Sequence, residues 1–455
     1  MRNAKSSLLV ISAFVAFLSL KWALAPTPAE ASSIRDAEIE HTIRVYASPL
    51  LKSAGLEPSD VSLHILNDKA VNAFVAGGQR IFLTSGLLMS ADRPEQVVGV
   101  LAHEIGHIIG GHLARMNGAV ADARNKALIG QLVGFALGVL SKDSSVLAAT
   151  SLKGSDIALQ GLLKFSRTQE RSADQVAADL LENTGTSASG LLEFFEILKD
   201  QELLVRARQD NYAVTHPLTQ DRIAFIREHI DNSRFSANRL PDRIQVMHDR
   251  MVAKLRAFIN PPRQTLLEYS EDDPAISSRY ARAIALYRDA RVDKALELVD
   301  ELIEIAPDDP YFHELLGQIL FENARLKGAL PAYERAVEFR PREPLLRVGL
   351  AHVQIELNSP DLIKSAINNL EQAQRYDRLM PFSWQLAATA YGRNGQLGVS
   401  SLALAEYNLL LGKFLDAQGQ ARKAARLLPT NSPGWLRAQD IKATARRARE
   451  RQSTR

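Results

Sequence analysis

Two histidines and a glutamate have a spacing that could bind a metal ion and use it in hydrolysis. The run His103-Glu104-Ile105-Gly106-His107 follows apolar residues and contains no proline, which predicts a helix. Residues i and i+4 of a helix share a face, so both imidazoles can reach one cation. Imidazole nitrogen suits Zn²⁺, and Glu104 is placed to take a proton from a metal-bound water. The pattern predicts one zinc ion per chain.

The flanks of this run bear on whether it is a site or a chance match. In a chain of 455 residues the same letters can fall by chance on a surface helix with two unrelated histidines. Here the preceding residues 97–102 are almost all apolar. Three polar groups in such surroundings are costly unless something satisfies them. The flanks therefore favour a metal site.

A catalytic zinc site needs a third protein ligand and an open position for water. Within residues 166–174, Glu170 and Asp174 are four residues apart, so one helix can present both carboxylates. One can bind the metal while the other accepts the free N–H of a ligating histidine. A solvated helix face is the alternative. His216 and Arg222 are further candidates.

Composition limits what else the chain can be. It has no cysteine, which excludes disulfides, iron–sulfur clusters, thiol catalysis and thiolate zinc sites. A metal must then be held by histidine and carboxylate. The 55 basic and 52 acidic residues give a net charge of +3, which provides no global field for binding nucleic acid.

Residues 1–31 are predicted to be a cleavable signal peptide. Arg2 and Lys5 precede an apolar stretch from Leu8 to Leu20, and Ala29-Glu30-Ala31 has the small-x-small cleavage pattern. The stretch is shorter than the about 20 residues that cross a bilayer. We expect export and a mature chain that starts near Ser32; a retained N-terminal anchor is the alternative.

The elements that must position the site lie in a mixed region. A helical stretch over residues 34–54 leads to strand-like residues 61–66. Residues 72–84 have the pattern of a hairpin that turns at Gly77-Gly78. Asn260-Pro261-Pro262 interrupts the helical pattern, which indicates a domain boundary there.

Two segments of this region have more than one interpretation. Residues 79–84 alternate like a strand and are expected to form a sheet edge to which an extended peptide substrate adds; an ordinary internal strand is the alternative. Residues 127–140 are apolar, with Gly130, Gly134 and Gly138 in one stripe. A buried core helix is the first interpretation of this run. A mobile lid or a segment at a membrane interface is the alternative.

The C-terminal half carries a repeat of 34 residues. Ala295, Val299, Leu302 and Pro307 recur as Ala329, Tyr333, Ala336 and Pro341. This is the tetratricopeptide (TPR) spacing, in which small residues allow two helices to pack closely. A third copy arrives three residues late, after an insertion at 358–361, and a plain helical bundle is the alternative. Residues 446–455 are expected to be a solvated basic end, not a nucleic-acid site, because no aromatic residues are interleaved.

Taken together, these motifs resemble peptidase family M48, the gluzincin-type zinc metallopeptidases, over about residues 33–235. The resemblance rests on His103-Glu104-Ile105-Gly106-His107, Glu170 to Asp174, Asn72-Ala73-Phe74 with Gly77-Gly78, and Thr215-His216-Pro217 with Arg222. It implies zinc on His103, His107 and Glu170, with Glu104 as general base and Asp174 supporting a ligand. It also implies His216 at the site, as a self-inhibiting ligand or a transition-state contact.

His112 has a counterpart in the family, where a polar residue usually precedes it. Here it follows Gly110-Gly111, so we leave it out of the metal shell. The expected fold class is an α+β, mostly helical gluzincin-type domain over 32–262, an all-α TPR solenoid over 275–445 and a basic tail over 446–455.

The leader and the repeats narrow the resemblance to a periplasmic group of the family. This implies an endopeptidase of misfolded or stalled outer-membrane proteins, whose TPR domain binds substrates or the outer-membrane assembly machinery, with peripheral membrane contact also considered. A chaperone or adaptor in which proteolysis is secondary is the alternative, and the intact set of His103, Glu104, His107 and Glu170 favours the enzyme. An integral-membrane prenyl-protein peptidase is not expected, because the sequence has no second hydrophobic span.

Overall fold

The computed structural model describes residues 33–112, 115, 167–204, 216 and 218–453. The predicted signal peptide and the apolar segment 127–140 lie outside the described residues. Within the described part, no helix has both the length and the apolar character needed to cross a bilayer.

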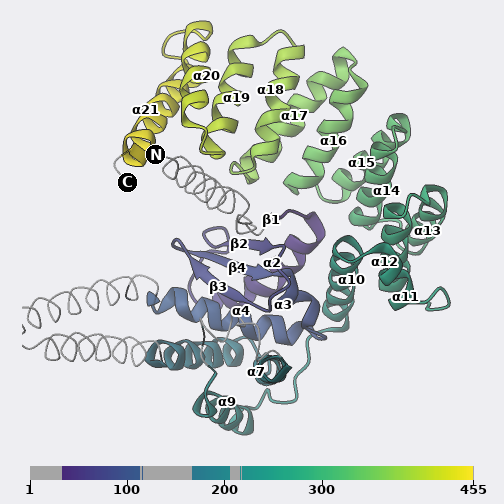
Figure 1. Cartoon of the computed structure of the whole chain (residues 1–455), viewed down its shortest axis with the longest axis vertical. Coiled ribbons are helices and arrows are strands. Elements are labelled where there is room, and N and C mark those ends of the chain that lie inside the picture. Colours follow the sequence, from purple (N-terminus) through teal and green to yellow (C-terminus); the bar gives the residue numbers. More distant parts are fainter. Residues whose placement is uncertain (1–32, 113–114, 116–166, 205–215, 217, 454–455) are drawn as a thin grey trace, which may run out of the picture.

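A small mixed sheet lies at the centre of the N-terminal part (Figure 1). Its strands are β1 (Ser33–Ile34), β2 (Ser62–Leu66), β3 (Ala73–Ala76) and β4 (Arg80–Thr84), in the spatial order β1-β2-β4-β3. β2 and β4 are parallel, whereas β1 with β2 and β3 with β4 are antiparallel. The hairpin predicted over residues 72–84 is confirmed: Gly77 and Gly78 make its turn at positive φ.

The position of β4 corrects one prediction. Residues 79–84 are predicted to form a sheet edge, but β4 lies inside the sheet, between β2 and β3. The hairpin folds β3 onto one side of β4, and β2 pairs with the other side. Among the described residues, the free edge at this end of the sheet therefore belongs to β3.

One face of the sheet packs on helices to form the core. Ile65, Ile81 and Leu83 point into it and meet α2 (Ala37–Ser53) and α4 (Pro94–Ile109). α4 is buried over its whole length from Pro94 to Gly106, because its sequence is apolar on nearly every side. α7 (Ser189–Leu204) covers another side of α4. The helix that carries the predicted metal ligands is thus the central helix of the domain.

The C-terminal half is an arc of helix pairs, as the 34-residue repeat predicts (Figure 1). The pairs are α12 (Ile276–Arg288) with α13 (Val292–Ile305), α14 (Pro310–Glu322) with α15 (Leu326–Phe339), α16 (Pro344–Leu357) with α17 (Pro360–Tyr376), α18 (Pro381–Arg393) with α19 (Leu397–Leu410), and α20 (Phe414–Leu427) with α21 (Pro433–Ser453). α12, α14 and α16 begin 34 residues apart. α17 is 17 residues long, against 14 for α13 and α15, so the three inserted residues extend this helix by about one turn. The TPR solenoid is confirmed.

Tyr333 of α15 shows why the repeat requires small residues. A Cβ atom at Gly317 of α14 would lie 2.6 Å from Tyr333 Cδ2, and one at Gly349 of α16 would overlap the same ring. The ring is enclosed between two helices and cannot retreat from an added methyl group. Glycine at these positions sets how closely the three helices approach.

We expect Gly317→Ala to lower the free energy of unfolding by about 1–3 kcal/mol, because the new methyl group overpacks the Tyr333 ring. Gly419 of α20 is the matched control, since a Cβ there would have no atom within 4 Å. Gly419→Ala should instead raise stability by about 0.5–1 kcal/mol through helix propensity. Urea unfolding of both variants measures the difference. Equal stability of Gly317→Ala and the parent chain would show that Tyr333 has room to move.

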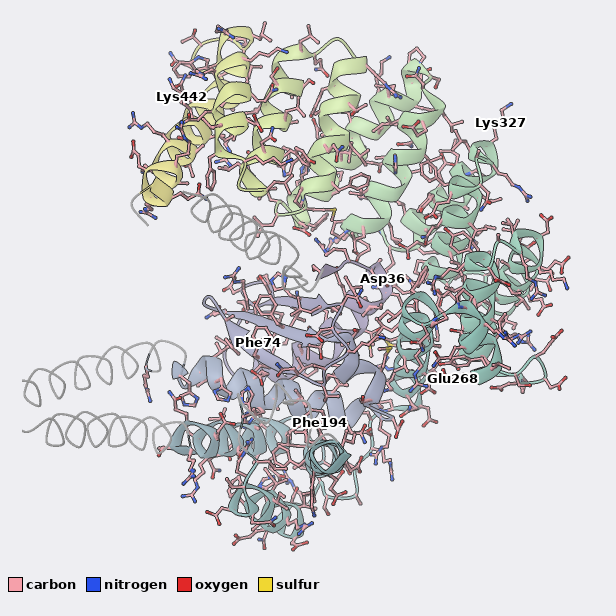
Figure 2. All side chains as sticks on the ribbon, viewed as in Figure 1. Asp36, Phe74, Phe194, Glu268, Lys327 and Lys442 are labelled. Atoms are coloured by element: carbon pink, nitrogen blue, oxygen red, sulfur yellow. The ribbon has the colours of Figure 1, made fainter. Side chains whose placement is uncertain are left out.

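Buried charges occupy the junction between the two halves of the chain, where Figure 2 labels Asp36. Lys254 of α10 (Asp242–Ile259) has 4% of its side chain exposed. Its Nζ lies 2.8 Å from Asp36, 3.4 Å from Glu38 and 3.7 Å from Glu314 of α14. One ammonium group thus joins the start of α2 to the repeats.

A second cation of α10 repeats the arrangement. Arg250 Nη2 lies 2.6 Å from Glu38, and Nη1 lies 2.6 Å from Asp309 at the start of α14. Tyr280 of α12 donates a 2.8 Å hydrogen bond to the same Glu38. α10 therefore belongs to both halves: its apolar residues contribute to the core of the N-terminal part and to the core of the first repeats.

Candidate metal centre

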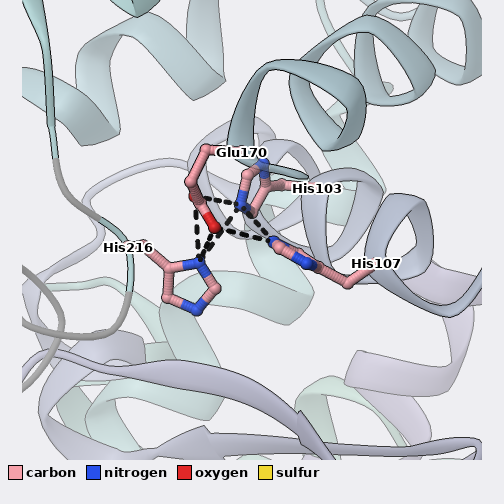
Figure 3. A group of neighbouring side chains, drawn as sticks. All are labelled: His103, His107, Glu170 and His216. Atoms are coloured by element: carbon pink, nitrogen blue, oxygen red, sulfur yellow. Dashed lines mark hydrogen bonds and ion pairs between the residues drawn. The ribbon is translucent and has the colours of Figure 1, made fainter. Parts of the chain in front are cut away.

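Two helices and one further segment bring the predicted site residues together (Figure 3). The residues come from α4, from the helix over residues 167–183, and from the segment just before α9 (Gln220–Asn232). In that order they are His103, Glu104 and His107, then Glu170 and Asp174, then His216.

Four of these side chains converge on one point. Ligand atoms of His103, His107, Glu170 and His216 all lie within 4.8 Å of one another. His103 Nε2 is 3.0 Å from His107 Nε2, and each of these nitrogens is 3.3 Å from a Glu170 oxygen. His216 Nδ1 is 3.2 Å from Glu170 Oε2 and 3.4 Å from His103 Nε2. Ligand atoms around a tetrahedral zinc, with bonds of about 2.0–2.1 Å, are separated by about 3.3–3.4 Å. The arrangement fits a small tetrahedral cation.

A close approach of two helices produces this geometry. A Cβ atom at Gly106 would lie 2.7 Å from the carbonyl oxygen of Ala173. α4 and the helix over 167–183 therefore touch backbone to backbone at this point. A larger residue at position 106 would push Glu170 away from the two histidines.

Carboxylates outnumber permanent cations at the site. Glu104, Glu170 and Asp174 are all buried. Among the arginines and lysines that the structure describes, Arg222 of α9 forms ion pairs with this group, through Glu170 and Asp174. Arg222 Nε and Nη2 donate to the two oxygens of Asp174 at 2.6 and 2.8 Å, and Nη1 lies 3.1 Å from Glu170. The carboxylates then retain a charge of about −2, which a divalent cation would balance.

The histidine pKa values follow from the same excess of negative charge. Burial lowers the pKa of His103, but contacts with Asp174 and Glu170 outweigh burial and raise it to about 9. His103 Nδ1 lies 2.9 Å from Asp174 Oδ1, although the contact is bent from the ideal hydrogen-bond direction. Burial would raise the pKa of Glu170, yet hydrogen bonds with His103, His107 and His216 hold it far below its usual range. A metal ion bound at this point would compete with a proton on these ligand nitrogens.

Glu104 is fully buried, and neither of its carboxylate oxygens has a hydrogen-bond partner among the described residues. His216 Nε2 lies 3.7 Å from its Oε1. A buried carboxylate left without hydrogen bonds is costly and requires an explanation. A carboxylate kept free of hydrogen bonds beside the ligand atoms is available to accept a proton.

His112 is the residue at the site that the sequence argument leaves out. It is not one of the four converging ligands; its Nδ1 lies 3.0 Å from His107 Nδ1. Burial and the neighbouring His107 lower the pKa of His112 to about 4, so its imidazole is neutral at pH 7. The two glycines before it are the sequence signal that could have indicated a tight return of the chain.

Several known proteins are similar to this chain. Residues 33–230 match the model of peptidase family M48. The Beta-barrel assembly-enhancing protease of Yersinia pestis is 24% identical over 402 residues, which cover 86% of this chain and 80% of that protein. Metalloprotease YcaL of Escherichia coli (strain K12) is 31% identical over 180 residues, 39% of this chain and 64% of that protein. Among solved structures, YrrB, described as a TPR protein with an unusual peptide-binding site, covers 39% of this chain and 92% of its own at 16% identity and a TM-score of 0.32. The chain carries a peptidase family M48 domain and is a metallopeptidase.

Proposed function

We propose that the chain is a periplasmic zinc endopeptidase that cleaves outer-membrane proteins which are unfolded or stalled in assembly. The observation that carries the catalytic part is the convergence of His103, His107 and Glu170 beside the unpartnered carboxylate of Glu104. The client class is supported by similarity over 86% of the chain to relatives named Beta-barrel assembly-enhancing protease. The export pattern of residues 1–31 supports the compartment.

Each site residue has a role in the proposed mechanism. His103, His107 and Glu170 would hold one zinc ion, which would acidify a bound water and polarise the scissile carbonyl. Glu104 accepts the proton of the attacking water and delivers it to the leaving amine. Asp174 accepts the Nδ1 hydrogen of His103, which leaves Nε2 free as the ligand atom.

Arg222 is a positioning residue in this scheme. Its guanidinium is buried, and it holds both oxygens of Asp174 while its third nitrogen lies beside Glu170. These contacts fix the orientation of the proposed metal ligand Glu170 and of Asp174, which contacts the proposed ligand His103. All three nitrogens of the Arg222 guanidinium are occupied by these contacts. We therefore assign stabilisation of the oxyanion of the tetrahedral intermediate to His216.

His216 is proposed to close the site at rest. Its Nδ1 lies among the ligand atoms, so four protein ligands would surround the metal and leave no position for water. Hydrolysis then requires the His216 imidazole to move aside. From a displaced position the same ring can donate a hydrogen bond to the oxyanion.

The exposed edge of β3 is the proposed docking strand for an extended substrate, because β3 lies beside α4. Thr84 N donates to Asn72 O at 3.0 Å, which makes these two residues a hydrogen-bonded pair. By antiparallel alternation Phe74 forms the next such pair, with Phe82. The N–H and C=O of Val75 therefore point away from β4, toward the free edge.

Val75→Pro tests this assignment, because it removes an N–H at the free edge without breaking the pairing with β4. Loss of one main-chain hydrogen bond, about 0.5–1.5 kcal/mol, should lower kcat/KM about 2- to 10-fold, mainly through KM. Val75→Thr is the matched control, since it keeps both the N–H and the β-branched shape. Steady-state cleavage of an extended peptide measures both variants. Equal kcat/KM values would place the substrate elsewhere.

The client class is tested with one outer-membrane β-barrel protein presented in two states. The protein is added either freshly diluted from urea or folded in detergent micelles. We expect cleavage of the unfolded form alone, lost with a chelator and restored by Zn²⁺. An unfolded soluble protein of similar length is the control client. Absence of cleavage in both states would refute the proposal, and equal cleavage of the control would widen the client class to unfolded proteins in general.

A further inference from the structure

We propose that His112 is a positioning residue for the metal ligand His107, and that Gly110 is glycine so that His112 can reach it. This inference rests on the proposed metal centre, and it assigns a role to a histidine outside the ligand set. It concerns how the site holds its metal, separately from how it cleaves peptides.

The His107 ring has one nitrogen toward the ligand atoms and the other toward His112. Its Nε2 faces the converging ligand atoms, so its Nδ1 is the outward nitrogen. A neutral imidazole that binds a metal through Nε2 carries its hydrogen on Nδ1. That hydrogen points to His112 Nδ1, 3.0 Å away, with the two rings edge to face. His112 therefore accepts the hydrogen bond and carries its own hydrogen on Nε2.

His112 gives His107 a supporting partner, as the other two proposed ligands already have. His103 is supported by Asp174, and Glu170 by Arg222. The hydrogen bonds among the described residues give His107 Nδ1 one partner, which is His112. Partners of this kind fix the tautomer and orientation of a ligating histidine. Here the partner is a ring nitrogen, where His103 has a carboxylate oxygen.

The backbone of His112 is itself anchored. Gln169 Nε2 donates a 3.0 Å hydrogen bond to the carbonyl oxygen of His112. Gln169 directly precedes Glu170 on its helix. The same two helices that hold the ligands therefore also hold the supporting histidine.

Gly110 lies just past the end of α4, against the His112 ring. A Cβ atom at this position would lie 2.6 Å from Cε1 and 2.7 Å from Cδ2 of the His112 ring. Any side chain at position 110 would therefore displace the ring from His107. Gly111 differs: its φ is +59° and no atom lies within 4 Å of a Cβ built there. Gly111 makes the turn, and Gly110 leaves space for the ring.

The experiment measures zinc affinity of the full chain by competition with a chromophoric chelator. His112→Leu should bind zinc about 10- to 100-fold more weakly, as for other partners of ligating histidines. His112→Asn places Oδ1 where Nδ1 lies and should keep most of the affinity. Gly110→Ala should match His112→Leu. Gly111→Asn, which tolerates positive φ and meets no neighbour, should match the parent chain.

A second measurement separates positioning from general damage. The visible absorption of the Co²⁺-loaded chain reports ligand geometry, and we expect it to change in His112→Leu and Gly110→Ala but not in His112→Asn. Parent-like affinity in His112→Leu would overturn the inference, as would equal losses in the Leu and Asn variants. A parent chain that binds no zinc would instead refute the proposed metal centre, so the two failures are distinguishable.

Discussion

Glu104→Gln is expected to lower the rate of peptide cleavage by about 100- to 10,000-fold, the usual contribution of a positioned general base. The amide has nearly the shape of the carboxylate but cannot accept the proton of the attacking water. Neither oxygen of Glu104 accepts a hydrogen bond from the described residues, so the amide breaks no hydrogen bond that the carboxylate makes. Zinc content should therefore be retained, and the melting temperature should stay level or rise. Cleavage of a quenched fluorescent peptide, metal analysis and thermal unfolding check the three expectations.

Glu95→Gln is the matched control, because it makes the same change in the same helix away from the ligands. The glutamine can still accept the hydrogen bond that Glu95 receives from the backbone N–H of Leu240. A Glu104→Gln enzyme that cleaves at the parent rate would refute the assigned base. If the inactive variant fully supports outer-membrane assembly in cells, the adaptor function would be favoured over proteolysis.

Glu170→Ala should weaken zinc binding by about 100-fold or more, because it removes the anionic ligand and leaves imidazoles alone. Activity should fall with zinc occupancy. Asp179→Ala, an exposed position on the same helix, is the control and should bind zinc like the parent chain. Metal analysis after dialysis against a weak chelator gives the readout.

The position of His216 sharpens this experiment. In Glu170→Ala three histidines still face the same point, so residual zinc could remain on them. The double variant Glu170→Ala with His216→Ala shows whether His216 holds the residual zinc. Undiminished zinc in the single variant, lost only in the double one, would make His216 the third ligand and overturn the assignment of Glu170.

Local patterns predicted the parts of this molecule that depend on short stretches of chain. The apolar surroundings of His103 predict a buried helix, since period and burial are properties of one segment. The 34-residue phasing of Ala295 and Ala329 predicts helix pairs for the same reason. The geometry of the candidate site also follows largely from two i, i+4 pairs, one on each helix.

What could not be predicted depends on pairing between distant segments. The choice of β3 as the free edge follows from the parallel pairing of β2 with β4, which no local alternation in residues 79–84 reveals. His112 was left out because its role depends on a turn that brings its ring back along α4. The contact between Tyr280 and Glu38 joins positions 242 residues apart, and neither residue has a local pattern that indicates the other.

The buried charges at the junction have a consequence for how clients are cut. Drawing the repeats away from α10 would separate Glu314 from Lys254, Asp309 from Arg250 and Tyr280 from Glu38, and removing partners from buried charged groups costs several kcal/mol. These contacts therefore hold the repeats against α10. In two modules joined by a flexible linker, by contrast, the effective concentration of one module at the other depends on linker length. A client gripped by the arc would lie at a fixed distance from the ligand atoms of α4. The bond that is cut would then be selected by its spacing along the client from the gripped segment, more than by the residues that flank it.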